Sequence, residues 1–221
     1  MPVDINIIVE SLPALWNGLK LTALISVLGI PLGLAIGTMM AYMVGSKALP
    51  LRMIGKAYVE MVRNVPFLIL VYLTYFGFPK LGINISAEAV AIGTICFYTG
   101  GYFCEILRAS LASVSSGQVA AASSLGLSPV QVQRYIVLPQ LLGFLIPPLT
   151  SLTIMMFKDS AIFSVIGLSE LTYQSNLVIA NTFAYAEILC TTAAIYWICS
   201  ILMDAIGQYA EKKTTYWLRN S

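Results

Sequence analysis

The sequence has no histidine and few charged residues. Of its 221 residues, 10% are Asp, Glu, Lys or Arg and none is His, whereas a soluble domain devotes about a quarter of its residues to charge. Without histidine, the chain lacks the commonest metal ligand and the side chain most often used for acid–base catalysis near neutral pH. We therefore expect no metal site, no cofactor held by this chain and no histidine-based catalysis.

Two further motifs are missing. No Cys-x-x-Cys pair occurs, and the four cysteines all lie inside apolar stretches: Cys96, Cys104, Cys190 and Cys199. We interpret them as small apolar packing residues.

There is no Gly-x-x-x-x-Gly-Lys-Ser/Thr loop for binding phosphate, so this chain is not itself the ATP-driven motor of a transport system. The N-terminal segment lacks a basic start, and we expect no cleaved signal peptide.

Hydrophobic residues, in contrast, make up 58% of the chain. A transmembrane helix needs about 20 mainly apolar residues, and five stretches qualify: roughly Leu19–Val44, Val62–Phe78, Ala87–Leu107, Leu138–Phe157 and Thr182–Tyr209. A sixth apolar patch, Ala161–Leu168, is too short to span and is interpreted as an interfacial or re-entrant piece on the outer side. The expected fold is an all-α integral membrane protein with five transmembrane helices in one domain over residues 1–221.

The orientation follows from the basic residues, because short cytoplasmic loops carry an excess of Lys and Arg. Nine lie in or beside the loops after spans one and three and in the C-terminal tail: Lys47, Arg52, Lys56, Arg63, Arg108, Arg134, Lys212, Lys213 and Arg219. The opposite side has Lys80 and Lys158, and Lys20 at the start of the first span is left out of this count. The N-terminus is therefore expected outside and the C-terminus in the cytoplasm, with a cytoplasmic loop at about 109–137.

Three glycines recur every fourth residue in the first span: Gly29, Gly33 and Gly37. This spacing places them on one helix face and is typical of helices that approach a neighbour closely in membranes.

Charged residues near the membrane fall into two groups. Because spans two and three run in opposite directions, the first group shares one level near the cytoplasmic face and is predicted to form a structural or gating cluster: Glu60, Arg63, Glu105 and Arg108. The second group, Lys158, Asp159 and Glu187, lies towards the outer ends of spans four and five. It offers charges of both signs for a zwitterionic substrate, or it is an ordinary set of interfacial side chains.

The cytoplasmic loop is predicted to fold as two helices around a glycine. Gly126 suits the left-handed conformation that ends a helix. Ser128 is a preferred N-cap, followed by Pro129 at the first helical position and Gln131 at the third. The apolar residues Leu125, Leu127 and Val130 surround this turn, and we expect them to dock on a partner or to pack on the inner membrane face of the chain.

Four segments then carry a family resemblance, in order along the chain. They are VRNVPFLILVYLTYFGFP (62–79), GGYFCEILRASLASVSSGQ (100–118), GQVAAASSLGLSPVQVQRYIVLPQ (117–140) and IPPLTSLTIMMFKDSAI (146–162). The chain resembles permease subunits of bacterial ABC importers, of the polar amino acid branch and the type I importer fold. Its third segment is similar to the cytoplasmic coupling motif called the EAA loop, but Ala120-Ala121-Ala122 replaces Glu-Ala-Ala. Lys158-Asp159-Ser160 stands for Lys-Asp-Thr/Ser of the fourth span, so Ser160 joins Lys158, Asp159 and Glu187 as a candidate residue of the substrate pathway.

The resemblance implies residues that couple this chain to an ATPase: Ala120, Ala121, Leu125, Gly126, Leu127, Ser128, Pro129 and Val130. It implies a multi-pass subunit of the bacterial plasma (inner) membrane that forms half of a pathway for polar amino acids or their derivatives, by alternating access. The implied partners are an ABC ATPase dimer that binds ATP and Mg, a second permease subunit, an extracytoplasmic solute-binding protein and membrane lipid. No nucleic-acid partner is expected.

Two other functions are weighed against this one. A secondary, ion-coupled amino acid transporter often carries internal repeats; none is evident, and that function leaves the cytoplasmic motif unexplained. A membrane-embedded enzyme needs a catalytic constellation at one depth, and no Ser/Lys or paired-Asp arrangement indicates one.

Overall fold

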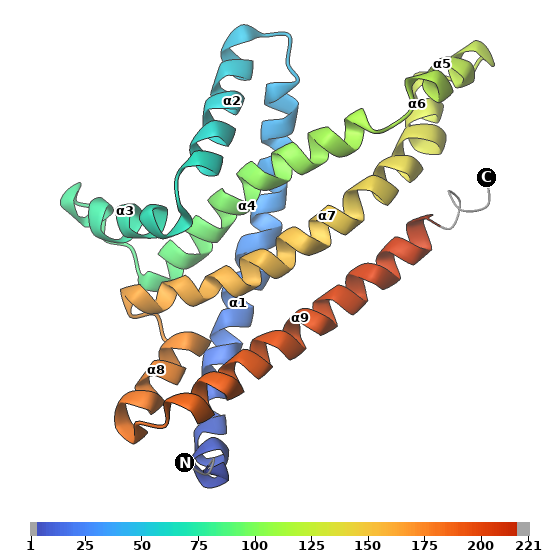
Figure 1. Ribbon diagram of the computed structural model, residues 1–221. Coiled ribbons are helices and arrows are strands. Elements are labelled where there is room, and N and C mark those ends of the chain that lie inside the picture. Colours follow the sequence, from blue (N-terminus) through green and yellow to red (C-terminus); the bar gives the residue numbers. More distant parts are fainter. Residues whose placement is uncertain (1–3, 216–221) are drawn as a thin grey trace.

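The computed structural model describes residues 4–215, which are almost entirely helical (Figure 1). The elements, in order, are α1 (Ile5–Val44), α2 (Leu49–Asn64), α3 (Phe67–Lys80), α4 (Ala87–Ala112), α5 (Ser116–Ser124), α6 (Pro129–Val132), the π-helix η1 (Gln133–Val137), α7 (Leu138–Asp159), the 3-10 helix η2 (Ser160–Ile166), α8 (Leu171–Thr182) and α9 (Tyr185–Thr215). No strand is assigned within the described residues. The predicted all-α class is therefore confirmed.

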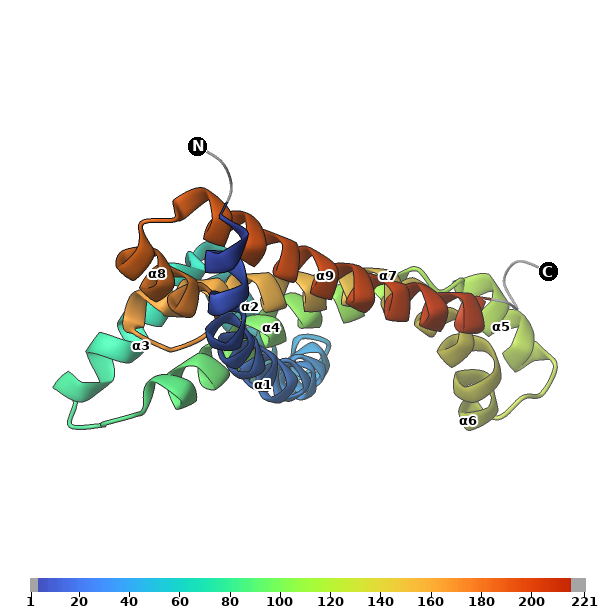
Figure 2. The same ribbon diagram turned by 90° about the horizontal axis from the view of Figure 1, so that it is seen from below.

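Three long helices, α4, α7 and α9, lie side by side, and α1 crosses and contacts all three (Figures 1 and 2). Where α1, α4, α7 and η2 meet, Ile25, Ile95, Met156 and Phe163 are fully buried. The helices α5 and α6 lie at one end of this arrangement with the C-terminal end of α9. The start of α1 and α8 lie at the opposite end (Figure 1).

The glycine face of α1 packs directly against α4, as predicted. A Cβ atom added to Gly33 would lie 2.7 Å from the backbone oxygen of Cys96, and one added to Gly37 would lie 2.6 Å from that of Gly100. Real Cβ atoms do not approach backbone this closely. Only glycine permits this helix separation, which explains the small-residue spacing in the first span.

Four helices of the described chain are long and apolar enough to cross a membrane alone, and five spans result if the bent pair α2–α3 counts as one. The predicted span over Val62–Phe78 is not one continuous helix. The chain breaks at Val65, which is extended, and the axes of α2 and α3 differ by 105°. Pro66 explains the break, because proline disfavours the helical conformation of the residue before it.

The other predicted spans correspond to helices, with different ends. The first begins much earlier than Leu19, because Asp4 caps α1 by accepting a hydrogen bond from the backbone N–H of Asn6 at 3.0 Å. The third and fourth begin where expected, at Ala87 and Leu138. The short patch over residues 161–168 folds mainly as η2, which continues α7 within the helical segment Pro129–Ile166; the helix α8 that follows was not predicted.

Candidate functional site

The hairpin of α5 and α6, joined around Gly126, has the geometry that the sequence predicted. Gly126 has a φ of +82°, so the chain turns there in the left-handed region. The backbone N–H of Leu127 reaches back to the oxygen of Ala122 at 3.2 Å. At the start of α6, the Ser128 hydroxyl accepts from the Gln131 N–H at 3.4 Å, while the Ser128 N–H donates to the Gln131 side chain at 2.8 Å. Both ends of the turn are therefore held by capping bonds.

The apolar corner of this hairpin faces outward. Leu125 is 81% exposed and Val130 is 75% exposed, whereas Ala122 and Val132 are buried between the two helices. Within the described chain, α5 and α6 contact only each other and η1. The corner therefore does not pack against the membrane helices of its own chain, which was the alternative to docking on a partner.

A π-helical turn connects the hairpin to α7 and was not predicted. In η1 the N–H of Leu138 bonds to the oxygen of Gln133, five residues back. Pro139 is the signal that was available: it has no N–H for the oxygen of Tyr135 and its ring crowds that carbonyl, which a wider turn relieves. The result is one unbroken helical rod of 38 residues, Pro129–Ile166.

The predicted inner charge cluster is largely assembled, between α2 and α4. Glu105 accepts a hydrogen bond from Arg108 and forms an ion pair with Arg63 at 3.6 Å. These three side chains are between 32% and 53% exposed. Glu60 lines the same cavity of about 290 Å³, yet its carboxylate forms no ion pair in the described structure. An exposed arrangement of this kind contributes only about 0–1 kcal/mol per pair.

The predicted outer group is less closely connected. Ser160 is fully buried and its hydroxyl donates to the backbone oxygen of Phe157 at 2.6 Å. Lys158 is exposed, and Asp159 and Glu187 are half-buried. In the part of the chain that is described, no ion pair or side-chain hydrogen bond joins Lys158, Asp159 and Glu187 to one another.

Sequence reasoning missed the most buried acid of the described structure, Glu170, which is 0% exposed. Its carboxylate caps α8 by accepting from the N–H groups of Thr172 at 2.9 Å and Tyr173 at 2.7 Å. The hydroxyl of Tyr196 on α9 donates to it at 3.2 Å. Burial raises the pKa of Glu170 to about 7, although these hydrogen bonds act in the opposite direction. The available signal was an acid placed directly between an apolar run and a new helix.

Leu171, the next residue, joins α8 to the first helix. Its N–H donates to the buried hydroxyl of Thr22 at 3.2 Å. Gly18 permits this contact, because a Cβ there would lie 2.8 Å from the Cα of Leu171. The Glu170 region thus holds α1, α8 and α9 together at the end of the molecule opposite the hairpin.

This architecture has known counterparts. The family model of the inner membrane component of binding-protein-dependent transport systems matches residues 29–216. The chain belongs to this family. It is a multi-pass membrane permease subunit of an ABC importer, and ATP hydrolysis is the task of a separate subunit.

Individual relatives cover nearly the whole chain. A probable amino-acid ABC transporter permease of Bacillus subtilis, YckA, is 37% identical over 87% of this chain and 86% of its own length. The glutamine transport system permease GlnP of Escherichia coli is 32% identical over 96% of this chain and 98% of its own length.

Solved structures agree. A crystal structure of an amino acid ABC transporter with histidines has a TM-score of 0.89 at 31% identity, covering 96% of this chain and all of the compared chain. The permease of a methionine importer, at 21% identity and a TM-score of 0.67, shares the fold.

Proposed function

We propose that the chain is the permease of an ATP-dependent importer for polar amino acids or amino-acid derivatives. It forms half of the pathway beside a second permease, identical or homologous, in the bacterial plasma membrane. The relatives named for glutamine and for glutamate and aspartate support this substrate class. A solute-binding protein delivers the substrate at the outer face, and an ABC ATPase dimer binds ATP and Mg at the inner face.

The orientation that we propose has the N-terminus outside and the C-terminus in the cytoplasm. The loop between α1 and α2, the hairpin of α5 and α6, and the end of α9 share one side of the molecule (Figure 1). On the same side, Lys47 lies in the loop between α1 and α2, Arg134 follows the hairpin in η1, and Lys212 and Lys213 end α9, which supports a cytoplasmic position. One permease domain then extends over residues 1–221, with the coupling loop at about 109–137.

The observation that carries this function is the exposed apolar corner at Leu125 and Val130. A protruding, capped hairpin with two largely exposed aliphatic side chains needs a protein surface to cover it. We assign ATPase contact to the corner and to the residues around it: Ala120, Ala121, Leu125, Gly126, Leu127, Ser128, Pro129 and Val130. Because Ala120 replaces the acid of the family motif, this contact depends on shape and apolar area.

The rod from Pro129 to Ile166 explains how the contact acts on transport. A helix rises 1.5 Å per residue, so 38 residues extend over about 57 Å. Movement of the hairpin when the ATPase closes is therefore transmitted to the far end of α7. Lys158, Asp159 and Ser160 lie at that end and, with Glu187, are the proposed substrate pathway. The same movement of the hairpin also acts on the inner charge cluster, which we propose as a gate.

That gate is the inner charge cluster, whose members are Glu60, Arg63, Glu105 and Arg108. A half-exposed cluster between α2 and α4 has weak ion pairs that exchange readily with water. Such pairs suit an element that must open and close in each cycle.

The experiment that tests this function compares two charge insertions in the hairpin. In Val130→Asp the buried interface receives an unpaired charge, and we expect the ATPase to be lost on purification while the permease still inserts. Gln118→Asp, with the same charge one helix earlier, should retain the ATPase. The coupling assignment is wrong if substrate-stimulated ATP hydrolysis survives Val130→Asp.

The same preparation distinguishes the ion-coupled alternative. In proteoliposomes that contain the purified importer, uptake should require ATP and should be unaffected when sodium and proton gradients are dissipated. Uptake that follows an ion gradient without ATP would indicate a secondary transporter instead.

A further inference from the structure

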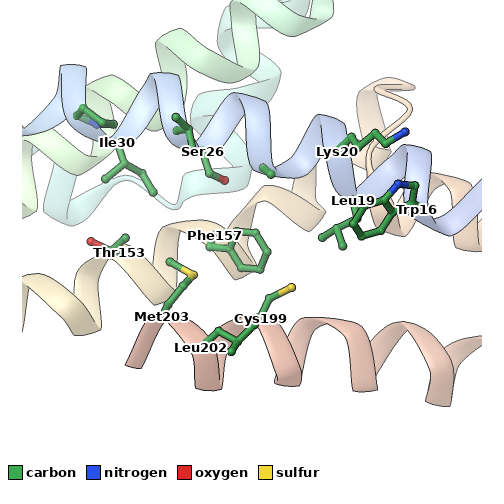
Figure 3. A pocket seen from close by; sticks show the side chains of 13 residues that line it. Trp16, Leu19, Lys20, Ser26, Ile30, Thr153, Phe157, Cys199, Leu202 and Met203 are labelled. Carbon is green, nitrogen blue, oxygen red and sulfur yellow. The ribbon is translucent and has the colours of Figure 1, made fainter. Parts of the chain in front are cut away.

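A cavity lies between α1, α7 and α9, and none of its lining residues belongs to the hairpin or to the inner charge cluster. Its volume is about 660 Å³. Trp16, Leu19 and Lys20 lie together at one end, and Ile30 and Thr153 lie towards the other (Figure 3). We call this cavity the α1–α9 groove.

The walls of the groove are apolar even where polar residues line it. The hydroxyl of Ser26 donates to the backbone oxygen of Thr22 at 2.8 Å, and that of Thr153 donates to Leu149 at 2.9 Å. Both donors are therefore satisfied within their own helices. No acid lines the groove. A zwitterionic amino acid would find no partner for its ammonium group there, so the groove is not a substrate site.

One end of the groove carries a positive charge without an acidic partner. Lys20 is exposed, and its ammonium group donates to the Asn17 side chain at 3.3 Å and lies 5.8 Å from the ring centroid of Trp16. It forms no ion pair within the described residues. Tryptophan and lysine together are typical of the membrane–water interface. The mouth of the groove is therefore at headgroup level.

The depth of the groove matches one leaflet of a bilayer. From Leu19 to Pro31 the lining follows α1 for 12 residue steps, or about 18 Å. Half of a hydrocarbon core of about 30 Å is about 15 Å. An acyl chain entering beside Lys20 would therefore reach the level of Pro31 near the middle of the membrane.

We propose that the α1–α9 groove binds one anionic phospholipid, with its phosphate at Lys20 and an acyl chain along the apolar wall. The ammonium group of Lys20 matches the phosphate of such a lipid. The apolar wall and the depth of about 18 Å match its acyl chain. In the orientation proposed above, the lipid belongs to the outer leaflet. It occupies the space between the crossing helix α1 and the pair α7–α9, which must move relative to α1 during alternating access.

Trp16 is a built-in reporter of this lipid. The test uses the full chain, purified in the complex that it forms in cells, with Trp197 and Trp217 replaced by phenylalanine, and the Trp16 signal is the difference between this protein and one that also carries Trp16→Phe. Fluorescence is measured in nanodiscs that contain increasing fractions of phosphatidylglycerol or phosphatidylcholine with brominated acyl chains. We expect brominated phosphatidylglycerol to reach half-maximal quenching at about a fivefold lower fraction, the preference that one lysine near an anionic surface supplies.

Two variants and one control test whether Lys20 and the groove cause the preference for phosphatidylglycerol. Lys20→Gln should remove it, so that both lipids quench equally. Ala23→Phe fills the groove wall and should reduce quenching by both lipids. Lys80→Gln removes an exposed lysine outside the groove and should leave the fivefold preference unchanged.

Three results would overturn the proposal. The first is equal quenching by the two lipids in the chain with Lys20 present. The second is a preference for phosphatidylglycerol that persists in Lys20→Gln. The third is the absence of quenching by either lipid, which would show that protein, such as a second permease copy, covers the groove.

Discussion

Two glutamates join helices in this molecule, and they do so by opposite means. Glu105 is 32% exposed and lies between two arginines, at the level proposed for a cytoplasmic gate. Glu170 is fully buried, forms no ion pair in the described chain and is held by two backbone N–H groups and a tyrosine. Charge pairs in contact with water are weak and exchangeable, whereas buried hydrogen-bonded groups are costly to disturb. The first arrangement suits a moving part, and the second a fixed one.

The largest effect is expected from Glu170→Ala. It leaves the two backbone N–H donors at the start of α8 without their acceptor, whereas the Tyr196 hydroxyl keeps its hydrogen bond with Thr172. We expect a loss of about 2–6 kcal/mol in the free energy of unfolding, since each of the two unsatisfied buried donors costs about 1–3 kcal/mol. Chemical denaturation in detergent measures it. A loss below that of the Glu105→Gln variant described below would contradict the comparison.

The pH dependence of stability should come next in size. Because the pKa of Glu170 is raised from 4.5 to about 7 in the folded chain, the folded state binds a proton more tightly than the unfolded state. Its contribution is fully present below about pH 4.5 and is lost as the pH rises towards 7. We expect the stability of the native chain, relative to Glu170→Gln, to fall between pH 5 and pH 7. Melting temperatures of both proteins across this range provide the measurement, and parallel curves would contradict the assignment.

A smaller effect is expected from Tyr196→Phe. This change removes the hydrogen bond to Glu170 and the one with the Thr172 hydroxyl, and it keeps the aromatic ring, whose centroid lies 5.8 Å from that of Phe157. The expected loss is about 1–2 kcal/mol, the contribution of two such hydrogen bonds. Combining it with Glu170→Ala in a double-mutant cycle should give a total smaller than the sum, because both changes affect the same bond. An additive result would mean that Tyr196 acts independently of Glu170.

The smallest effect on stability is expected at the other glutamate. Glu105→Gln removes both ion pairs, which are partly exposed, and should cost less than about 1 kcal/mol, falling further at high salt. Transport should nevertheless change if the cluster is a gate. ATP hydrolysis and uptake, measured together, should lose their fixed ratio in Glu105→Gln and keep it in Lys80→Gln, an exposed charge outside the cluster. Unchanged coupling would leave Glu105 with a structural role only.

The two regions also differ in how far they were predictable. Glu105 and Arg108 are three residues apart on one helix, and the antiparallel order of spans two and three placed Arg63 beside them. The hairpin was predictable for a similar reason, because Ser128, Pro129, Gln131 and Gly126 act through bonds to residues a few positions away. The spacing of residues along the sequence is sufficient to predict a contact when the bonded residues lie only a few positions apart.

Glu170 and the α2–α3 bend were not predicted. The acid is bonded to Tyr196, 26 residues later in the sequence, and its neighbour Leu171 is bonded to Thr22, 149 residues earlier. The bend at Val65–Pro66 did have a local cause, but the prediction of a span over Val62–Phe78 rests on the apolar run that follows the proline and takes no account of its effect on Val65.

The sequence by itself determined that the chain enters a membrane as helices, where the α5–α6 hairpin turns and which family it belongs to. These properties depend on composition, on spacing along one helix and on short motifs. Only the tertiary structure decided that Glu170 is buried among three donors, that α2 and α3 diverge and that an apolar groove remains between α1 and α9. The burial of a side chain, the angle between two helices and the space left between them all depend on how segments that are distant in the sequence pack together. The sequence of one segment alone does not determine its distance from another.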